Sequence, residues 1–154
     1  MSYDNHDEGC TDAHVRAILG SVRTIAMVGA SADPSKPSYD VLRVLSEAGY
    51  DMIPVNPRPD LAEIQGLTVY PSLQSIDRPV DMVDVFRPSR ELAGIAREAV
   101  DIGAKVLWAQ LEIHDDEAAR IAEAGGLEVV MDRCPKIELA RSSCTSDTDR
   151  ETRT

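Results

Sequence analysis

The chain has 154 residues, the length of one compact domain; 43% are hydrophobic and only 4% aromatic, and no apolar run is long enough to span a bilayer. The net charge of −11 comes from 27 acidic and 16 basic residues. Such a field repels polyphosphate backbones, so we expect no nucleic-acid partner. The lack of a spanning apolar run leads us to expect no membrane partner. Cys10, Cys134 and Cys144 are odd in number and widely spaced, which is typical of free thiols in a reducing compartment and predicts a cytoplasmic protein.

The two ends of the chain differ from its middle. Residues 1–10 are acidic and polar, and residues 142–154 alternate hydroxyl and charged side chains without one aliphatic or aromatic residue. Segments of this kind bury too little apolar surface to offset the entropy of ordering. We therefore expect disorder at 1–10 and 142–154, and a single folded domain over 11–141.

In the first half of this domain, apolar patterns typical of strands alternate with patterns typical of helices. The apolar run 24–29 predicts a strand buried on both faces. Apolar residues at helical spacing predict a helix over 38–48, followed by a strand over 51–56. Pro54 is awkward in a central strand, because it cannot donate to the ladder. A brief strand is expected at 67–70.

The second half repeats the pattern. A strand at 81–86 is followed by a helix that Ser89 caps, and a strand at 105–109 is followed by a helix at 115–124 and a last strand at 127–131. Strand and helix thus alternate from end to end. This order predicts an α/β, three-layer, Rossmann-like fold, in which a mostly parallel sheet carries helices on both faces.

The loop after the first strand is the first candidate site, because ligands of such sheets bind at the carboxyl ends of the strands. Gly29 allows a tight turn, Lys36 adds a positive charge one turn before the helix, and Ser38 can cap that helix, whose N–H groups favour phosphate. The loop has one glycine, so it does not match the GxGxxG fingerprint, and an ordinary strand-to-helix loop is the alternative. The candidate residues here are Gly29, Ala30, Ser31, Lys36, Pro37 and Ser38.

The loop after the second strand adds Val55, Asn56, Pro57 and Arg58. NAD-binding folds place a carboxylate at this strand end to accept hydrogen bonds from the ribose hydroxyls, and none stands here. Arg58 suits a ribose that carries an extra phosphate, as in NADP or coenzyme A, or it is an exposed turn residue.

Two later strands end in further candidates. Phe86 can pack beside a ligand, and Arg87 can reach a phosphate or support the neighbouring loop. Gln110 follows the strand that contains Trp108, and its amide can both donate and accept hydrogen bonds. We expect Trp108 itself to belong to the core.

Seven segments within residues 22–138 carry a family resemblance. They are Ile25–Ser31 (IAMVGAS), Lys36–Tyr39 (KPSY), Gly49–Pro57 (GYDMIPVNP), Val69–Leu73 (VYPSL), Pro79–Arg87 (PVDMVDVFR), Ile102–Leu111 (IGAKVLWAQL) and Val130–Glu138 (VMDRCPKIE). In this order they resemble the CoA-binding-domain proteins, small stand-alone relatives of the CoA-binding domain of the succinyl-CoA synthetase α subunit. The resemblance implies a site for coenzyme A or an acyl-CoA at Gly29–Ser31, Lys36–Ser38, Val55–Arg58, Phe86–Arg87 and Gln110.

The sequence shows no catalytic residue pattern and no metal-ligand cluster. We therefore expect a CoA-binding protein that acts as a carrier, sensor or partner subunit, with no autonomous catalysis evident. One alternative is an NADP-dependent oxidoreductase, although little chain is left beyond the nucleotide fold to hold a substrate. Another is a thiol-redox protein that uses Cys134, whose competing interpretation is a buried small hydrophobe. A protein partner or a homo-oligomer is left open.

Overall fold

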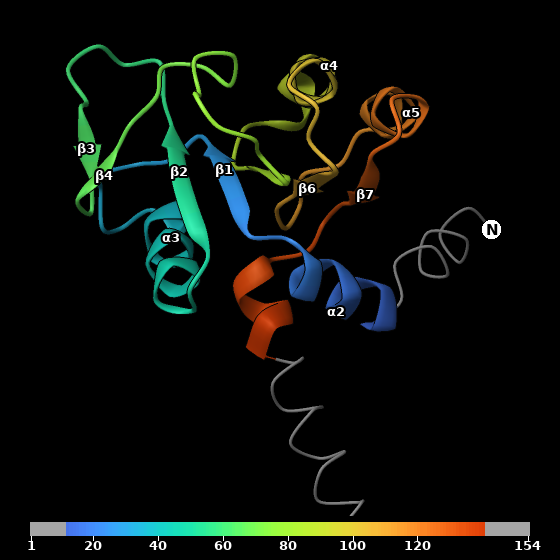
Figure 1. Cartoon of the computed structure of the whole chain (residues 1–154), viewed down its shortest axis with the longest axis horizontal. Helices are drawn as coiled ribbons and strands as arrows, with labels where there is room; N and C mark the ends of the chain where they lie inside the picture. The colour runs from blue at the N-terminus through green and yellow to red at the C-terminus, as the bar shows by residue number, and fades with distance from the viewer. Residues whose placement is uncertain (1–11, 141–154) are drawn as a thin grey trace, which may run out of the picture.

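The computed structural model describes residues 12–140 (Figure 1). The predictions of disorder at 1–10 and 142–154 lie outside these residues, so the domain boundaries stay predictions. The elements are α2 (Asp12–Ser21), β1 (Thr24–Val28), α3 (Pro37–Glu47), β2 (Asp51–Val55), β3 (Glu63–Ile64), β4 (Leu67–Thr68), β5 (Met82–Val85), the 3₁₀ turn η1 (Ser89–Glu91), α4 (Leu92–Asp101), β6 (Val106–Ala109), α5 (Asp116–Ala124) and β7 (Glu128–Val130). A further helical segment occupies residues 135–140.

Five strands form one parallel sheet in the order β2-β1-β5-β6-β7. The sheet confirms the predicted α/β, Rossmann-like fold. The chain first adds β2 on one side of β1 and then β5 on the other side, so the strand order reverses between β1 and β5. In doubly wound sheets ligands bind outside the carboxyl ends of the strands at such a reversal.

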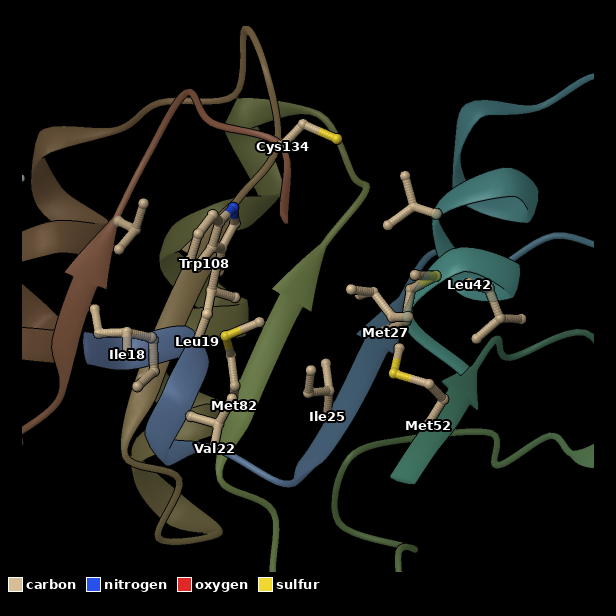
Figure 2. Packing of buried hydrophobic residues seen from close by; sticks show 14 of the residues in the cluster. Ile18, Leu19, Val22, Ile25, Met27, Leu42, Met52, Met82, Trp108 and Cys134 are labelled. Carbon is tan, nitrogen blue, oxygen red and sulfur yellow. The ribbon is translucent and has the colours of Figure 1, made fainter. Parts of the chain in front are cut away.

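Helices cover both faces of the sheet, as the alternation predicted (Figure 1). On one face, Met27 of β1 packs with α2, α3 and Leu139 of the last helical segment. Figure 2 shows this face, where Met82 and Trp108 from neighbouring strands share a cluster with Met27. On the opposite face, the preceding residue Ala26 packs with α4 and α5. The side chains of successive strand residues thus pack on opposite faces of the sheet.

The position of β2 at the edge of the sheet accommodates Pro54. The Pro54 carbonyl oxygen accepts a hydrogen bond from the Tyr70 N–H at 3.0 Å, on the side away from β1. The donor that proline lacks would therefore face outward and not toward the ladder. The strand expected at 67–70 is shorter in the structure, where β4 covers only Leu67–Thr68 and pairs antiparallel with β3. Tyr70 lies outside β4 and forms an isolated bridge with Val55 of β2.

Two helices begin differently from the prediction. α3 starts at Pro37, a residue favoured in a first helical turn, so Ser38 lies buried within the helix and Lys36 takes the N-cap position without a side-chain cap. Ser89 opens η1, and its Oγ accepts a hydrogen bond from the His114 N–H at 3.0 Å. The predictions that Ser38 and Ser89 cap their helices are therefore wrong.

α2 was not predicted, although the signal for it is present in the sequence. Val15, Ile18 and Leu19 are buried along one side of this helix, and their spacing is the helical one. Within residues 12–140, no helix combines the length and the apolar character that crossing a membrane requires.

Candidate functional site

The loops that follow β1, β2, β5 and β6 are joined at the carboxyl edge of the sheet. The Gly29 N–H donates to the Val55 carbonyl oxygen at 3.1 Å, and the Phe86 N–H donates to the last carbonyl oxygen of β1 at 2.8 Å. The Gln110 N–H donates to the last carbonyl oxygen of β5 at 3.3 Å. The structure thus brings the four predicted groups of site residues to one edge.

Gly29 makes the turn out of β1 possible. Its φ of +91° lies in the left-handed region, which side chains rarely adopt. A Cβ atom at this position would also lie 2.6 Å from the Phe86 carbonyl oxygen. The predicted glycine-dependent turn is present, whereas contact with a ligand stays a prediction.

The loop between Gly29 and α3 is shaped by its own side chains. Ser31 Oγ accepts a hydrogen bond from the Asp33 N–H at 3.0 Å, and Asp33 Oδ1 accepts from the Ser35 N–H at 3.0 Å and the Ser35 hydroxyl at 2.8 Å. These bonds from Ser35 hold the pKa of the Asp33 carboxyl below its usual range. The turn that they form carries the chain to Lys36.

The first turn of α3 presents uncapped backbone donors to this loop. Lys36 has an extended backbone at the N-cap position, and no side chain caps the helix there. The next residue, Pro37, has no N–H to satisfy. The Lys36 ammonium group is exposed and forms no salt bridge with any residue between 12 and 140. A full positive charge and the positive end of the helix dipole therefore lie together.

The two candidate arginines are each held by an acidic neighbour. Arg58 Nη2 and Nε donate to the two Asp60 carboxylate oxygens at 2.8 and 3.2 Å. Arg87 makes the same two-point contact with Glu91, at 2.8 and 3.0 Å. Exposed ion pairs of this kind contribute little to stability. A phosphate, which carries more charge than a single carboxylate, can therefore replace either acid at a small energetic cost.

Asn56 connects two of the loops. Its Nδ2 donates to the Ala30 carbonyl oxygen at 2.8 Å, and its Oδ1 accepts a hydrogen bond from the Arg58 N–H at 3.0 Å. The side chain was predicted to contact the cofactor, and here both of its ends hold backbone. It thus links the loop after β1 to the loop after β2.

The predicted site residues divide by exposure. The structure buries Ala30, Ser38, Val55 and Gln110, leaves Gly29, Ser31, Asn56 and Phe86 half-buried, and exposes Lys36, Pro37, Pro57, Arg58 and Arg87. The exposed group contains the three positive charges, so a ligand can meet these charges without a change in the core.

Cys134, the candidate redox thiol, belongs to the core. It is 6% exposed and packs in the same cluster as Trp108 (Figure 2). Trp108 is fully buried, as expected, and its Nε1 donates to the Arg133 carbonyl oxygen at 2.7 Å. Because a reactive thiol needs access, this burial favours a packing role for Cys134.

Asp84 is a buried polar residue that was not among the predicted site residues. It lies within the apolar run of β5 with 0% exposure, and among residues 12–140 neither carboxyl oxygen has a hydrogen-bond partner. Burial raises the pKa of Asp84 well above its ordinary value. The available signal was an acidic residue among the apolar residues of the strand predicted at 81–86.

Comparison with known proteins places the chain in a family. Residues 23–140 match the profile of a family described as CoA binding domain. The chain belongs to the CoA binding domain family. This membership confirms the resemblance noted in the sequence.

Relatives of the family occur both alone and inside larger proteins. The uncharacterized protein YneT of Bacillus subtilis (strain 168) is 40% identical over 125 residues, which make up 81% of this chain and 91% of that protein. The α subunit of ADP-forming acetate–CoA ligase I from Pyrococcus furiosus is 34% identical over 93 residues, which make up 58% of this chain but only 20% of that protein.

Solved structures agree with the fold. A hypothetical protein from Pyrococcus horikoshii OT3 superimposes with a TM-score of 0.82 at 36% identity, covering 87% of this chain and 93% of that one. A protein from Thermus thermophilus gives 0.81 at 38% identity, covering 86% of this chain and 99% of that one. The fold of the CoA binding domain thus recurs in proteins about as long as this one.

Proposed function

We propose that this protein binds coenzyme A, or an acyl-CoA, at the carboxyl edge of its sheet, and that it acts in the cytoplasm as a carrier, a sensor or a subunit of a larger assembly. The observation that carries the proposal is the uncapped first turn of α3 beside Lys36, next to the strand reversal between β1 and β5. Family membership supports coenzyme A as the ligand.

The pyrophosphate of coenzyme A fits the loop between Gly29 and α3. Backbone N–H groups at a helix N-terminus attract phosphate through hydrogen bonds and through the helix dipole. Lys36 adds a charge that no described residue neutralises by a salt bridge. The net charge of −11 opposes any anionic ligand, so these local donors carry much of the affinity.

The ribose phosphate of coenzyme A fits Arg58. The guanidinium group already makes a two-point contact with the Asp60 carboxylate, which is the geometry that it offers to phosphate. Because Arg58 is 66% exposed, exchange of Asp60 for a phosphate requires no burial of new charge. The same arginine accommodates the ribose phosphate of NADP, so a test must separate the two nucleotides.

The proposal predicts a thermal shift that depends on the nucleotide. A ligand at about 100 times its dissociation constant stabilises the fold by ~2.7 kcal/mol, which corresponds to about 5–10 °C in the melting temperature of a domain of this size. We expect a shift of this order with CoA, a smaller one with dephospho-CoA and little with NAD. Differential scanning fluorimetry with the full chain measures all three.

Two variants test the assignment of Arg58. Arg58→Ala should reduce the difference between the shifts with CoA and dephospho-CoA, because that difference reports the ribose phosphate. Arg97→Ala is the matched control, since Arg97 is an exposed arginine of α4 that pairs with Glu117, and it should leave the difference unchanged. A shift with NADP and none with CoA would replace the proposal by the oxidoreductase alternative.

A further inference from the structure

Asp84 occupies a position where a carboxyl group is costly. β5 is the central strand of the sheet. Asp84 is 0% exposed, and neither of its oxygens has a hydrogen-bond partner in the described part of the chain. A buried polar group without a partner loses its hydration and gains nothing in exchange. Such a group calls for a specific explanation.

The immediate neighbours of Asp84 in the sheet supply no donor. In register, Asp84 lies opposite Met27 of β1 and Trp108 of β6. Along β5, Met82 and Phe86 point to the same face, because side chains alternate along a strand. The one N–H among these side chains, Trp108 Nε1, already donates to a backbone carbonyl oxygen.

A second unpartnered group, Gln110, directly follows β6, the strand beside β5. Gln110 comes two residues after Trp108, so it projects to the same face one step nearer the carboxyl edge. Gln110 is 6% exposed, and its Oε1 is buried without a partner. Within residues 12–140, the two Asp84 oxygens and Gln110 Oε1 are the complete set of such side-chain atoms. Because one residue lies in β5 and the other directly follows the neighbouring strand β6, the two side chains can form a single polar unit.

All three atoms are acceptors, and a proton on one of them supplies the missing donor. A protonated carboxyl group has one O–H donor. We infer that the neutral carboxylic acid of Asp84 donates a hydrogen bond to Gln110 Oε1, and that Asp84 is thereby a positioning residue for Gln110. Burial, which raises the pKa of Asp84, keeps the acid in this neutral form. A buried acid that stays protonated in order to donate is known chemistry in proteins.

The pair has a consequence for the candidate site, which rests on the proposed function. With its carbonyl oxygen held toward Asp84, the side-chain amide of Gln110 presents its N–H₂ group to the loops at the carboxyl edge. A ligand in these loops then meets a donor of fixed orientation. Asp84 thus influences binding without touching the ligand.

A double-mutant cycle on the melting temperature of the full chain tests the pair. Asp84→Leu removes the donor and Gln110→Met removes the acceptor, so each variant leaves one buried group unpartnered and should melt earlier. Because both changes remove the same bond, the double variant should melt above the temperature obtained by adding the two losses. Asp84→Leu combined with Gln74→Met, a change at an exposed glutamine before β5, should be additive.

Binding of CoA gives a second readout. Asp84→Asn keeps a neutral donor and should retain the wild-type affinity, whereas Asp84→Leu should weaken binding severalfold and have no further effect in the Gln110→Met background. If the wild type does not bind CoA but the melting temperatures remain coupled, the proposed function fails and the pair stands.

A crystal structure of the wild type decides the matter even if Asp84→Leu does not fold. A carboxyl oxygen of Asp84 at about 2.5–3.0 Å from Gln110 Oε1 supports the pair. Additive losses in the cycle, or an ordered water or another donor bound to Asp84 in place of Gln110, would overturn it.

Discussion

Gly29 is fixed by two independent constraints, its φ of +91° and the Phe86 carbonyl oxygen that would lie 2.6 Å from a Cβ atom. Backbone strain of this kind costs about 1–3 kcal/mol. Gly29→Ala should therefore lower the free energy of unfolding by at least that amount, as measured by urea denaturation.

The matched control is Gly94 in α4, where an added Cβ atom meets nothing within 4 Å. Glycine costs roughly 0.5–1 kcal/mol relative to alanine inside a helix, so Gly94→Ala should raise the free energy of unfolding by about that amount. Equal effects at the two positions would show that Gly29 is under no special constraint.

Asp84 predicts a pH dependence of stability that is opposite to that of the surface carboxylates. Because burial raises its pKa in the folded state, its contribution is fully present below the unfolded pKa of about 3.9 and is lost as the pH rises toward the folded value. Asp84→Asn removes this loss. The free energy of unfolding of Asp84→Asn minus that of the wild type should increase from pH 4 to pH 8.

Urea denaturation at several pH values measures this difference. All other titrating groups are common to the two proteins, including Asp51 and Asp60, whose arginine partners lower their pKa values. A difference that does not change with pH would contradict the desolvation of Asp84.

At the residue scale, the sequence predicted where charged site residues lie better than it predicted which side chains they pair with. The positive charges of Arg58 and Arg87 follow strand ends and were found from the pattern alone. Their pairing with Asp60 and Glu91 was not, because it depends on how side chains fold back within each loop. The cost of burying Asp84 was equally hidden, since the strand pattern shows burial but not the lack of a donor.

At the scale of elements, α5 begins at a true cap. Asp115 accepts a hydrogen bond from the Ala118 N–H at 2.9 Å through its side chain. Loss of such a cap costs about 0.5–2 kcal/mol, so Asp115→Ala should lower the free energy of unfolding by about 1 kcal/mol. Asp115→Asn, which keeps the accepting oxygen, should recover most of this loss in the same denaturation assay; equal losses would assign the effect to charge instead.

The first residues of α5 and α3 differ in how well they could be predicted from the sequence. The helix at 115–124 was expected with nearly its observed bounds, and its first predicted residue, Asp115, is the N-cap in the structure. In α3 the proline at position 37 begins the helix one residue early, and this places Ser38 inside it. α2 lies inside the folded domain predicted at 11–141, but no element was predicted before residue 24.

At the scale of the molecule, the order of strands and helices was sufficient to predict the sheet and the edge that carries the site. The parallel order and the helices on both faces follow from the alternation. The reversal between β1 and β5 brings together four loops that are far apart in the sequence. What a ligand contacts in these loops depends on side-chain arrangement, which the alternation does not determine.

Calorimetric titration of CoA into the wild type, Lys36→Ala and Lys105→Ala tests the central claim most directly. Lys105 precedes β6 at the opposite edge of the sheet and is 77% exposed, so it matches Lys36 in charge but not in place. Because a hydrogen bond to a charged group contributes ~1.5–3 kcal/mol, Lys36→Ala should weaken CoA binding about tenfold or more, and Lys105→Ala should leave it unchanged. Binding of the wild type should also weaken with added salt. No binding to the wild type, or equal losses in both variants, would contradict a CoA site at the carboxyl edge.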